Sequence, residues 1–151
     1  MARATFFILL AATIAVYEAT QAEKEGEKAQ EETCALMVKV LDAVRGMPAA
    51  KLNLKVLKAG EENSWQIVCS RITDNDGEVH NLTLGTNFTE GIYKVEFDTK
   101  TYWKSVGLNP FHHVTDVVFE GSKLGHHHYT LAVLLSPYSF TTTAVVRSKH
   151  K

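Results

Sequence analysis

The chain has 151 residues, of which 45% are apolar, so it is long enough for one domain with a substantial core and too short for two comfortable domains. Sixteen basic and 17 acidic side chains leave a net charge of -1, which argues against a polybasic surface for nucleic acid. Two cysteines cannot build the disulfide framework of a very small secreted scaffold, so packing of apolar side chains must stabilise the fold.

The first 22 residues have the layout of a cleaved secretory signal. Arg3 precedes the apolar stretch FFILLAATIAV, and the segment ends in the small-residue site TQA at Ala22. The apolar stretch is too short to cross a bilayer. We expect residues 1–22 to be removed and the protein to be secreted to the extracellular space. A buried N-terminal helix is the alternative interpretation.

Residues 23–33 begin EKEGEKAQEE and contain almost no apolar side chain. Such a composition cannot bury enough surface to fold, and it predicts a disordered acidic arm. The folded domain is therefore expected over residues 34–147, followed by a short tail at 148–151.

From residue 35 onward, apolar and polar residues alternate with a period of two, which predicts β-strands separated by turns rich in Gly, Pro, Asn and Asp. The strand at 78–81 is short and mostly polar, so we expect it at the edge of a sheet. The predicted strands, in chain order, are 37–44, 52–58, 65–73, 78–81, 92–97, 115–120, 129–135 and 139–147.

Residues 98–107 break the period of two and predict one short helix. Asp98 can cap it, Tyr102, Trp103 and Val106 cluster on one side, and Gly107 can end it. The chain is therefore expected to have an all-β fold with one short helix, and strands at this spacing indicate a β-sandwich.

Two N-glycosylation acceptors lie in the turn-rich stretch before strand 92–97. Asn81-Leu82-Thr83 and Asn87-Phe88-Thr89 both match the acceptor pattern, and a secreted chain would meet the glycosylation machinery. Both asparagines are predicted modification sites, with unused acceptors as the alternative.

The seven histidines do not form a convincing metal site. In an extended strand His126 and His128 would share one face and His127 the other, and His112 and Asp116 could likewise share a face. Neither pair supplies the three or four ligands of a structural zinc site. We predict no metal site, only weak adventitious binding by exposed histidines.

The two cysteines allow two interpretations: Cys34 is an exposed thiol or a site of mixed disulfides, or it forms a disulfide with Cys69. Cys34 lies where the arm meets the first strand, and Cys69 lies inside the third strand. A disulfide is possible in an oxidising compartment, but it requires Cα atoms within about 7 Å, which the sequence leaves open.

Polar and aliphatic side chains mix on three strand faces in a way that suits a ligand slot. Such a slot could take a flat apolar ligand with a few polar points, with Lys39 holding an anionic end. An ordinary half-solvated sheet face is the alternative. The residues concerned are Lys39 and Leu41 on the first strand, Thr130, Ala132 and Leu134 on the seventh, and Thr141, Thr143 and Val145 on the eighth.

Three long segments resemble the transthyretin and 5-hydroxyisourate hydrolase family: CALMVKVLDAVRGMPA (34–49), EGIYKVEFDTKTYWKSVGLNPFH (90–112) and HYTLAVLLSPYSFTTTAVV (128–146). The resemblance runs essentially without gaps from residue 34 to 146. It implies a prealbumin-like Greek-key sandwich of two four-stranded sheets that pairs by its edge strands into a dimer. Two dimers would pack face to face into a homotetramer, whose central channel binds the thyroid hormones thyroxine and triiodothyronine at two symmetric sites.

The same resemblance implies a role for individual residues. Lys39 and Glu78 would stand at the channel mouth and pair with the carboxylate and the amino group of the hormone. Thr141 stands where serine is usual in mammalian members, so its extra methyl group should narrow the inner cavity. The implied apolar walls are Leu41, Thr130, Ala132, Val133, Leu134 and Val145, and the implied hydroxyl groups near the centre are those of Thr141 and Thr143.

A second implied role is docking of the plasma retinol-binding protein. The matching positions are Arg45, Val106, Leu108 and Tyr138, although Asn109 replaces the usual serine beside the contact.

The enzymatic branch of the family is the disfavoured alternative. Its 5-hydroxyisourate hydrolases use histidines and an arginine and end in Tyr-Arg-Gly-Ser, whereas this chain ends in FTTTAVVRSKHK. No nucleophile elbow, phosphate loop or metalloprotease motif occurs either. We therefore expect no catalytic residues, no cofactor and no enzymatic activity.

Overall fold

The computed structural model describes residues 36–62, 64–80, 82, 88–122 and 127–148. The predicted signal and arm, Cys34, and both predicted glycosylation sites, Asn81 and Asn87, lie outside the described residues, as does most of the predicted tail. Across the part of the chain that is described, no helix has the length and apolar character needed to cross a membrane.

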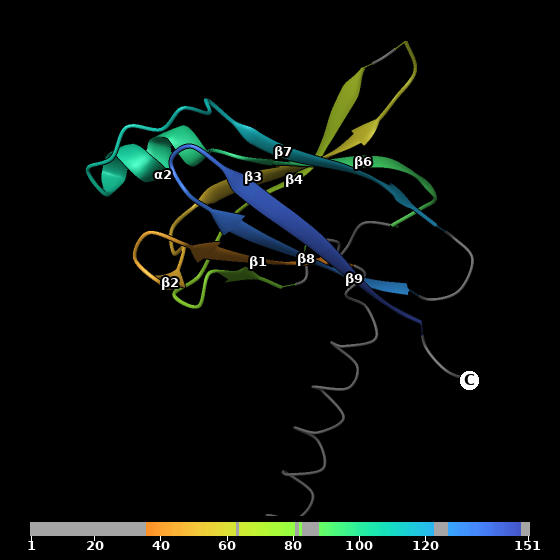
Figure 1. The fold of residues 1–151 in the computed structure, drawn as a ribbon. Helices are drawn as coiled ribbons and strands as arrows, with labels where there is room; N and C mark the ends of the chain where they lie inside the picture. Colours follow the sequence, from red (N-terminus) through yellow and green to blue (C-terminus); the bar gives the residue numbers. More distant parts are fainter. Residues whose placement is uncertain (1–35, 63, 81, 83–87, 123–126, 149–151) are drawn as a thin grey trace, which may run out of the picture. The chain divides into compact units, whose positions relative to one another are not determined.

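The described residues form strands joined by short turns, with a single helix after the sixth strand (Figure 1). The predicted all-β fold with one short helix is confirmed. The elements are β1 (Leu36–Asp42), β2 (Met47–Pro48), β3 (Asn53–Ala59), β4 (Trp65–Ile72), β5 (Glu78–Val79), β6 (Gly91–Phe97), α2 (Thr99–Ser105), β7 (Thr115–Gly121), β8 (His127–Leu135) and β9 (Phe140–Ser148).

The strands form two sheets, with orders β2-β1-β8-β9 and β4-β3-β6-β7. The short strands β2 and β5 both pair with the same edge of β1, through Leu41↔Pro48 and Lys39↔Glu78. The other edge of β1 pairs in parallel with β8. Because β2 and β5 share one edge of β1, the first sheet contains five strands but is only four strands wide. This agrees with the predicted sandwich of four-stranded sheets. The strand β5 lies at an edge, as predicted.

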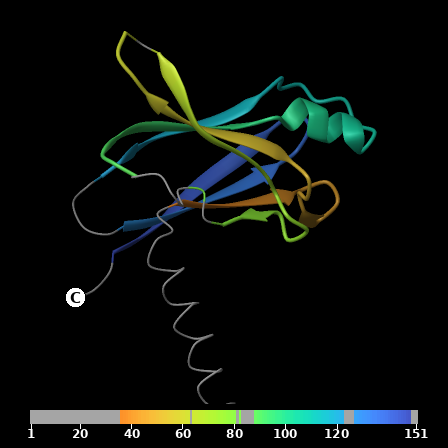
Figure 2. The ribbon, with the colours of Figure 1, turned by 180° about the vertical axis from the view of Figure 1, so that it is seen from behind.

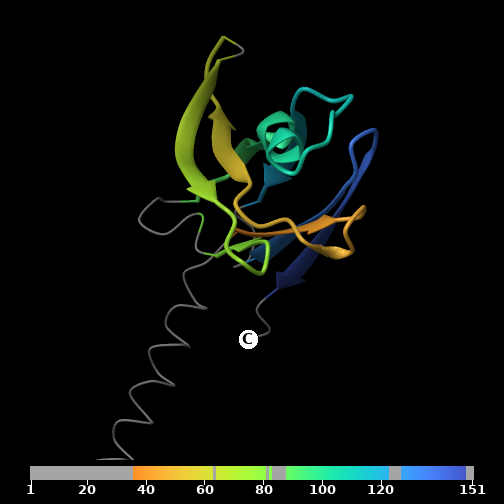
Figure 3. The same cartoon turned by 90° about the vertical axis from the view of Figure 1, so that its left-hand side faces the viewer.

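The core lies between the two sheets, which form separate layers when the domain is seen from behind and from the side (Figures 2 and 3). Side chains alternate along each strand, so one face of every central strand is buried and the other remains available to solvent or ligand. The buried set includes Val38 and Val40 of β1, Leu54 and Val56 of β3, Val95 and Phe97 of β6, and Leu131, Val133 and Leu135 of β8.

The helix α2 begins and ends where the sequence predicts. The Asp98 carboxylate accepts a hydrogen bond of 3.1 Å from the Thr101 N–H, which satisfies one of the unpaired donors of the first turn. Tyr102 and Trp103 are buried against the sandwich. Gly107, just beyond the helix, has a φ of +80°, which glycine adopts without steric strain.

Two details of the strands differ from strict alternation. The first strand ends at Asp42 rather than at residue 44, because the Asp42 carboxylate accepts hydrogen bonds of 2.9 Å from the backbone N–H groups of Val44 and Arg45 and turns the chain into β2. A register shift between Val56 and Leu57 gives β3 two consecutive buried residues, which a period of two does not predict.

Candidate functional site

The face of the β1, β8 and β9 strands that points away from the core carries most of the predicted ligand-binding residues. The pairing register aligns them in three rows: Met37, Thr130 and Val145; then Lys39, Ala132 and Thr143; then Leu41, Leu134 and Thr141. We call these nine residues the β8 face. Its row of Leu41, Leu134 and Thr141 is mostly apolar and open, since Leu41 is 39% and Leu134 is 43% exposed.

Val133 does not belong to the β8 face, although it is among the predicted wall residues. It is only 2% exposed and packs in the core, because odd and even positions of β8 point to opposite sides of the sheet. That same alternation identifies Met37, which shares a face with Lys39 but is absent from the predicted set. Strand parity alone could have found it.

Lys39 and Glu78 are joined at the β5 edge of this face, where they are register partners. The Lys39 ammonium donates to Oε1 of Glu78, and Nε2 of His80 lies 2.8 Å from Oε2 of the same carboxylate. The hydrogen bond with Glu78 raises the pKa of Lys39, and the hydrogen bond from Lys39 lowers the pKa of Glu78. Both groups are therefore charged at neutral pH.

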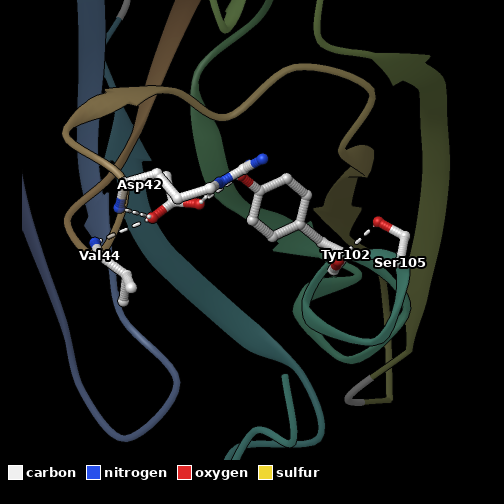
Figure 4. Close-up of polar contacts among 5 residues, drawn as sticks. Asp42, Val44, Tyr102 and Ser105 are labelled. Carbon is white, nitrogen blue, oxygen red and sulfur yellow. Dashed lines mark hydrogen bonds and ion pairs between the residues drawn. The ribbon is translucent and has the colours of Figure 1, made fainter. Parts of the chain in front are cut away.

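Arg45, one of the predicted docking residues, is held by Asp42 and Tyr102. Figure 4 shows these two partners, Asp42 at the end of β1 and Tyr102 on α2. Its Nε lies 2.7 Å from Oδ2 of Asp42, and its guanidinium also donates to the hydroxyl of Tyr102. The Tyr102 hydroxyl in turn donates to Asp42 at 2.9 Å. Burial, reinforced by this bond to Asp42, raises the pKa of Tyr102 to about 12. The network thus holds Arg45 against Tyr102, in the middle of α2.

The other predicted docking residues lie around the same helix and the β8–β9 turn. Val106 and Leu108 are half-buried and pack against the core. Tyr138 is 72% exposed and stacks on Phe111, with ring centroids 6.0 Å apart. The backbone N–H of Phe111 donates to the carbonyl of Pro137 at 2.8 Å, which ties the two aromatic segments together.

The remaining chemical candidates do not build a site among the described residues. The Cys69 thiol donates to the Leu82 carbonyl at 3.2 Å, and burial raises its pKa. Its possible disulfide partner lies outside the described part. No group of three or more His, Cys, Asp or Glu side chains suited to a metal occurs within the described ranges.

Two sheets of this strand order, with one short helix between β6 and β7 of the second sheet, define a prealbumin-like β-sandwich. Its most distinctive surface is an open sheet face with an ion pair at its edge. Residues 36–143 match the model of the HIUase/transthyretin family. The chain belongs to that family.

Individual relatives agree with this assignment. The chain is 61% identical over 113 residues to transthyretin of Aquarana catesbeiana, a match that covers 75% of this chain and 74% of the relative. A crystal structure of sea bream transthyretin in complex with thyroxine matches with a TM-score of 0.73 and 52% identity, covering 78% of this chain and 100% of the other. A structure of transthyretin from Sparus aurata gives a TM-score of 0.73 and 53% identity over 76% and 99% of the two chains. These relatives place the chain with the non-enzymatic members of the family.

Proposed function

We propose that this protein is an extracellular carrier of thyroid hormones, which bind in the central channel of a homotetramer. The observation that carries the proposal is the β8 face, where exposed aliphatic and hydroxyl side chains lie in register beside the Lys39–Glu78 ion pair. The thyroxine complex of sea bream transthyretin, a relative with 52% identity, supports the same ligand class.

Surfaces that a single copy leaves open support the proposed assembly. The strands β7 and β9 are terminal in their sheets, so each has an edge of unpaired backbone groups that can add a strand from a second copy. Exposed Val118 and Val146 lie on these strands. Two such dimers would then bring β8 faces together and bury Leu41, Leu134 and Val145 around a shared channel.

The channel would bind the hormone by contacts of two kinds. The aliphatic walls contribute roughly 25 cal/mol for each Å² of ring surface removed from water. The partly hydrated charges of Lys39 and Glu78 contribute less than the walls, because water screens them, and they orient the carboxylate and the amino group. Thr141 and Thr143 supply hydroxyl groups for the phenolic end. The methyl group of Thr141 should narrow the inner cavity and influence the rank of thyroxine against triiodothyronine.

The test is displacement of a fluorescent channel ligand by thyroxine and triiodothyronine, with a non-iodinated thyronine as the control. We expect competition by both hormones and much weaker competition by the control, because the iodines supply much of the apolar surface. Equal competition by all three, or none by any, would contradict the carrier function. Turnover of freshly prepared 5-hydroxyisourate would instead support the hydrolase alternative.

A second proposed role is docking of a retinol-binding protein by the surface of Arg45, Val106, Leu108 and Tyr138. The observation that favours it is the pair of exposed aromatic rings of Tyr138 and Phe111, since exposed aromatic residues are enriched in protein interfaces. Co-elution of the two proteins tests this role. The variant Tyr138→Ala should weaken co-elution, whereas Trp65→Ala, on the other sheet, should not.

Secretion and modification complete the proposal. Residues 1–22 act as the signal, residues 23–33 form the arm of the mature chain, and Asn81 and Asn87 carry glycans. N-terminal sequencing of the secreted protein should begin at Glu23. Glycosidase treatment should lower the mass of the intact protein, and an unchanged mass would remove the glycosylation sites from the account.

A further inference from the structure

The β8 face continues one row beyond the residues considered so far. His128 and Arg147 are register partners on β8 and β9, two residues outward from the pair Thr130↔Val145. Because side chains alternate along a strand, His128 and Arg147 point to the same side of the sheet as Thr130 and Val145. The rim of the face therefore ends in two basic residues.

This basic row lies apart from Lys39. Ala132, the β8 partner of Lys39, is four residues from His128, which is roughly 13 Å along an extended strand. The sheet order also places Arg147 on β9, two strands away from β1. A ligand whose carboxylate reaches Lys39 would thus need a further group, extending outward, to meet Arg147.

The charge surroundings of the two cations differ. Lys39 is paired with Glu78, and Asp74 and Asp76 also raise its pKa, all from the side of β1 that pairs with β5. Arg147 is exposed, and no ion pair joins it to an acid among the described residues. Its guanidinium therefore remains available for an anion, and its planar donors suit a carboxylate or sulfate.

We propose that Arg147, with His128 beside it, forms an outer anion contact of the channel, which favours iodothyronine derivatives with a second anionic group beyond the amino-acid carboxylate. This inference rests on the proposed carrier function and names a ligand class for the same site. Lys39 binds the first anionic group and Arg147 the second. A neutral extension of the same length gains nothing from Arg147.

The experiment compares N-succinyl-thyroxine with N-succinamoyl-thyroxine, its neutral amide of the same length. Both lack the charged amino group, and the succinyl derivative has one additional carboxylate on a short tether. We expect the full-length protein to bind the succinyl derivative about two- to fivefold more tightly, which is the range for an exposed ion pair. Added salt should reduce this preference, since exposed charges are screened.

Variants distinguish the effect of Arg147 on this preference from the effect of the protein's net charge. Arg147→Gln should abolish the preference for the succinyl derivative, and Arg147→Lys should retain most of it. The control Arg71→Gln removes an exposed arginine from β4 of the other sheet and should leave the preference unchanged.

The outcomes distinguish failure of the outer anion contact from failure of the carrier function. If wild-type protein binds thyroxine but does not prefer the succinyl derivative, or if Arg147→Gln keeps the preference, the outer anion contact is wrong and the carrier function stands. If thyroxine itself does not bind, the carrier function fails first. Loss of the preference in Arg71→Gln would mean that overall charge, and not Arg147, causes it.

Discussion

Lys39 on β1 and Glu78 on β5 are register partners and form an ion pair at the edge of the β8 face. Each charge is therefore already neutralised by the other in the protein without ligand. A hormone that uses both groups must exchange this internal contact for contacts of its own carboxylate and amino group. The net gain from the rim is therefore small, and the apolar rows must supply most of the affinity.

This balance predicts different effects for two substitutions on the β8 face. Leu134→Asp should abolish hormone binding, because it places a charge at the centre of the row formed by Leu41, Leu134 and Thr141. Lys39→Ala should weaken binding by no more than about fivefold, because it removes a partly hydrated charge. Titration calorimetry with thyroxine measures both effects, and Val133→Ala provides a control that changes the core but not the face. A larger loss for Lys39→Ala than for Leu134→Asp would refute the assignment of the walls.

The hydroxyl of Tyr102 links α2 to the buried carboxylate of Asp42 (Figure 4). Tyr102→Phe removes a hydrogen bond to a charged acceptor and should lower the free energy of unfolding by about 1.5–3 kcal/mol. Tyr138→Phe, in which the exposed ring loses a solvent-facing hydroxyl, should change it by less than about 0.5 kcal/mol. Urea denaturation measures both, and equal effects would mean that the network does not anchor the helix.

Asp42 also makes the fold sensitive to acid. Burial by itself raises the pKa of Asp42, but hydrogen bonds from the backbone and side chain of Arg45 and from Tyr102 outweigh it and hold the pKa below the ordinary value of 3.8. The carboxylate therefore contributes stability above about pH 3.8, and this contribution disappears as the pH falls through the lower folded-state pKa.

Asp42→Asn tests this dependence, because an amide does not titrate. The variant should be less stable than the wild type at neutral pH, and the difference between the two should shrink as the pH is lowered below about 3.8. Denaturant midpoints measured across this range provide the comparison. A constant difference at every pH would show that Asp42 contributes through packing and not through its charge.

Gly77 is required by a close backbone contact beside β5. Its φ is +70°, and a Cβ there would lie 2.3 Å from the Val40 carbonyl oxygen. Gly77→Ala should therefore displace the turn that leads into Glu78 and destabilise the fold by more than about 2 kcal/mol. Gly46→Ala is the matched control, because Gly46 has a φ of +65° with open space around it and should cost only about 1 kcal/mol. Thermal unfolding of both variants separates the steric clash from the backbone strain.

Much of the fold follows from local sequence pattern. Strand 92–97 and helix 98–107 are recovered nearly to the residue, because alternation, the Asp98 cap and Gly107 are signals that act within a few residues. The end of β1 at Asp42 is not recovered, since Ala43 and Val44 continue the apolar pattern. Only the structure reveals that the Asp42 side chain is buried and turns the chain.

The sequence predicts which residues of a strand share a face of the site, but it does not identify every site residue. Alternation places Thr130, Ala132 and Leu134 on one face, and the register confirms that they lie beside Lys39 and Leu41. Val133 enters the predicted set only through family resemblance, and its place in the core contradicts a wall role for its side chain. The pairing of His128 with Arg147 depends on the register between two strands, which spacing along the chain does not determine.

The most direct test of the account is the mass and hormone stoichiometry of the purified protein at micromolar concentration. Sedimentation measured with and without thyroxine should give a species of four chains that binds two hormone molecules. A single chain that sediments without bound hormone under the same conditions would contradict the shared channel on which the proposed function depends.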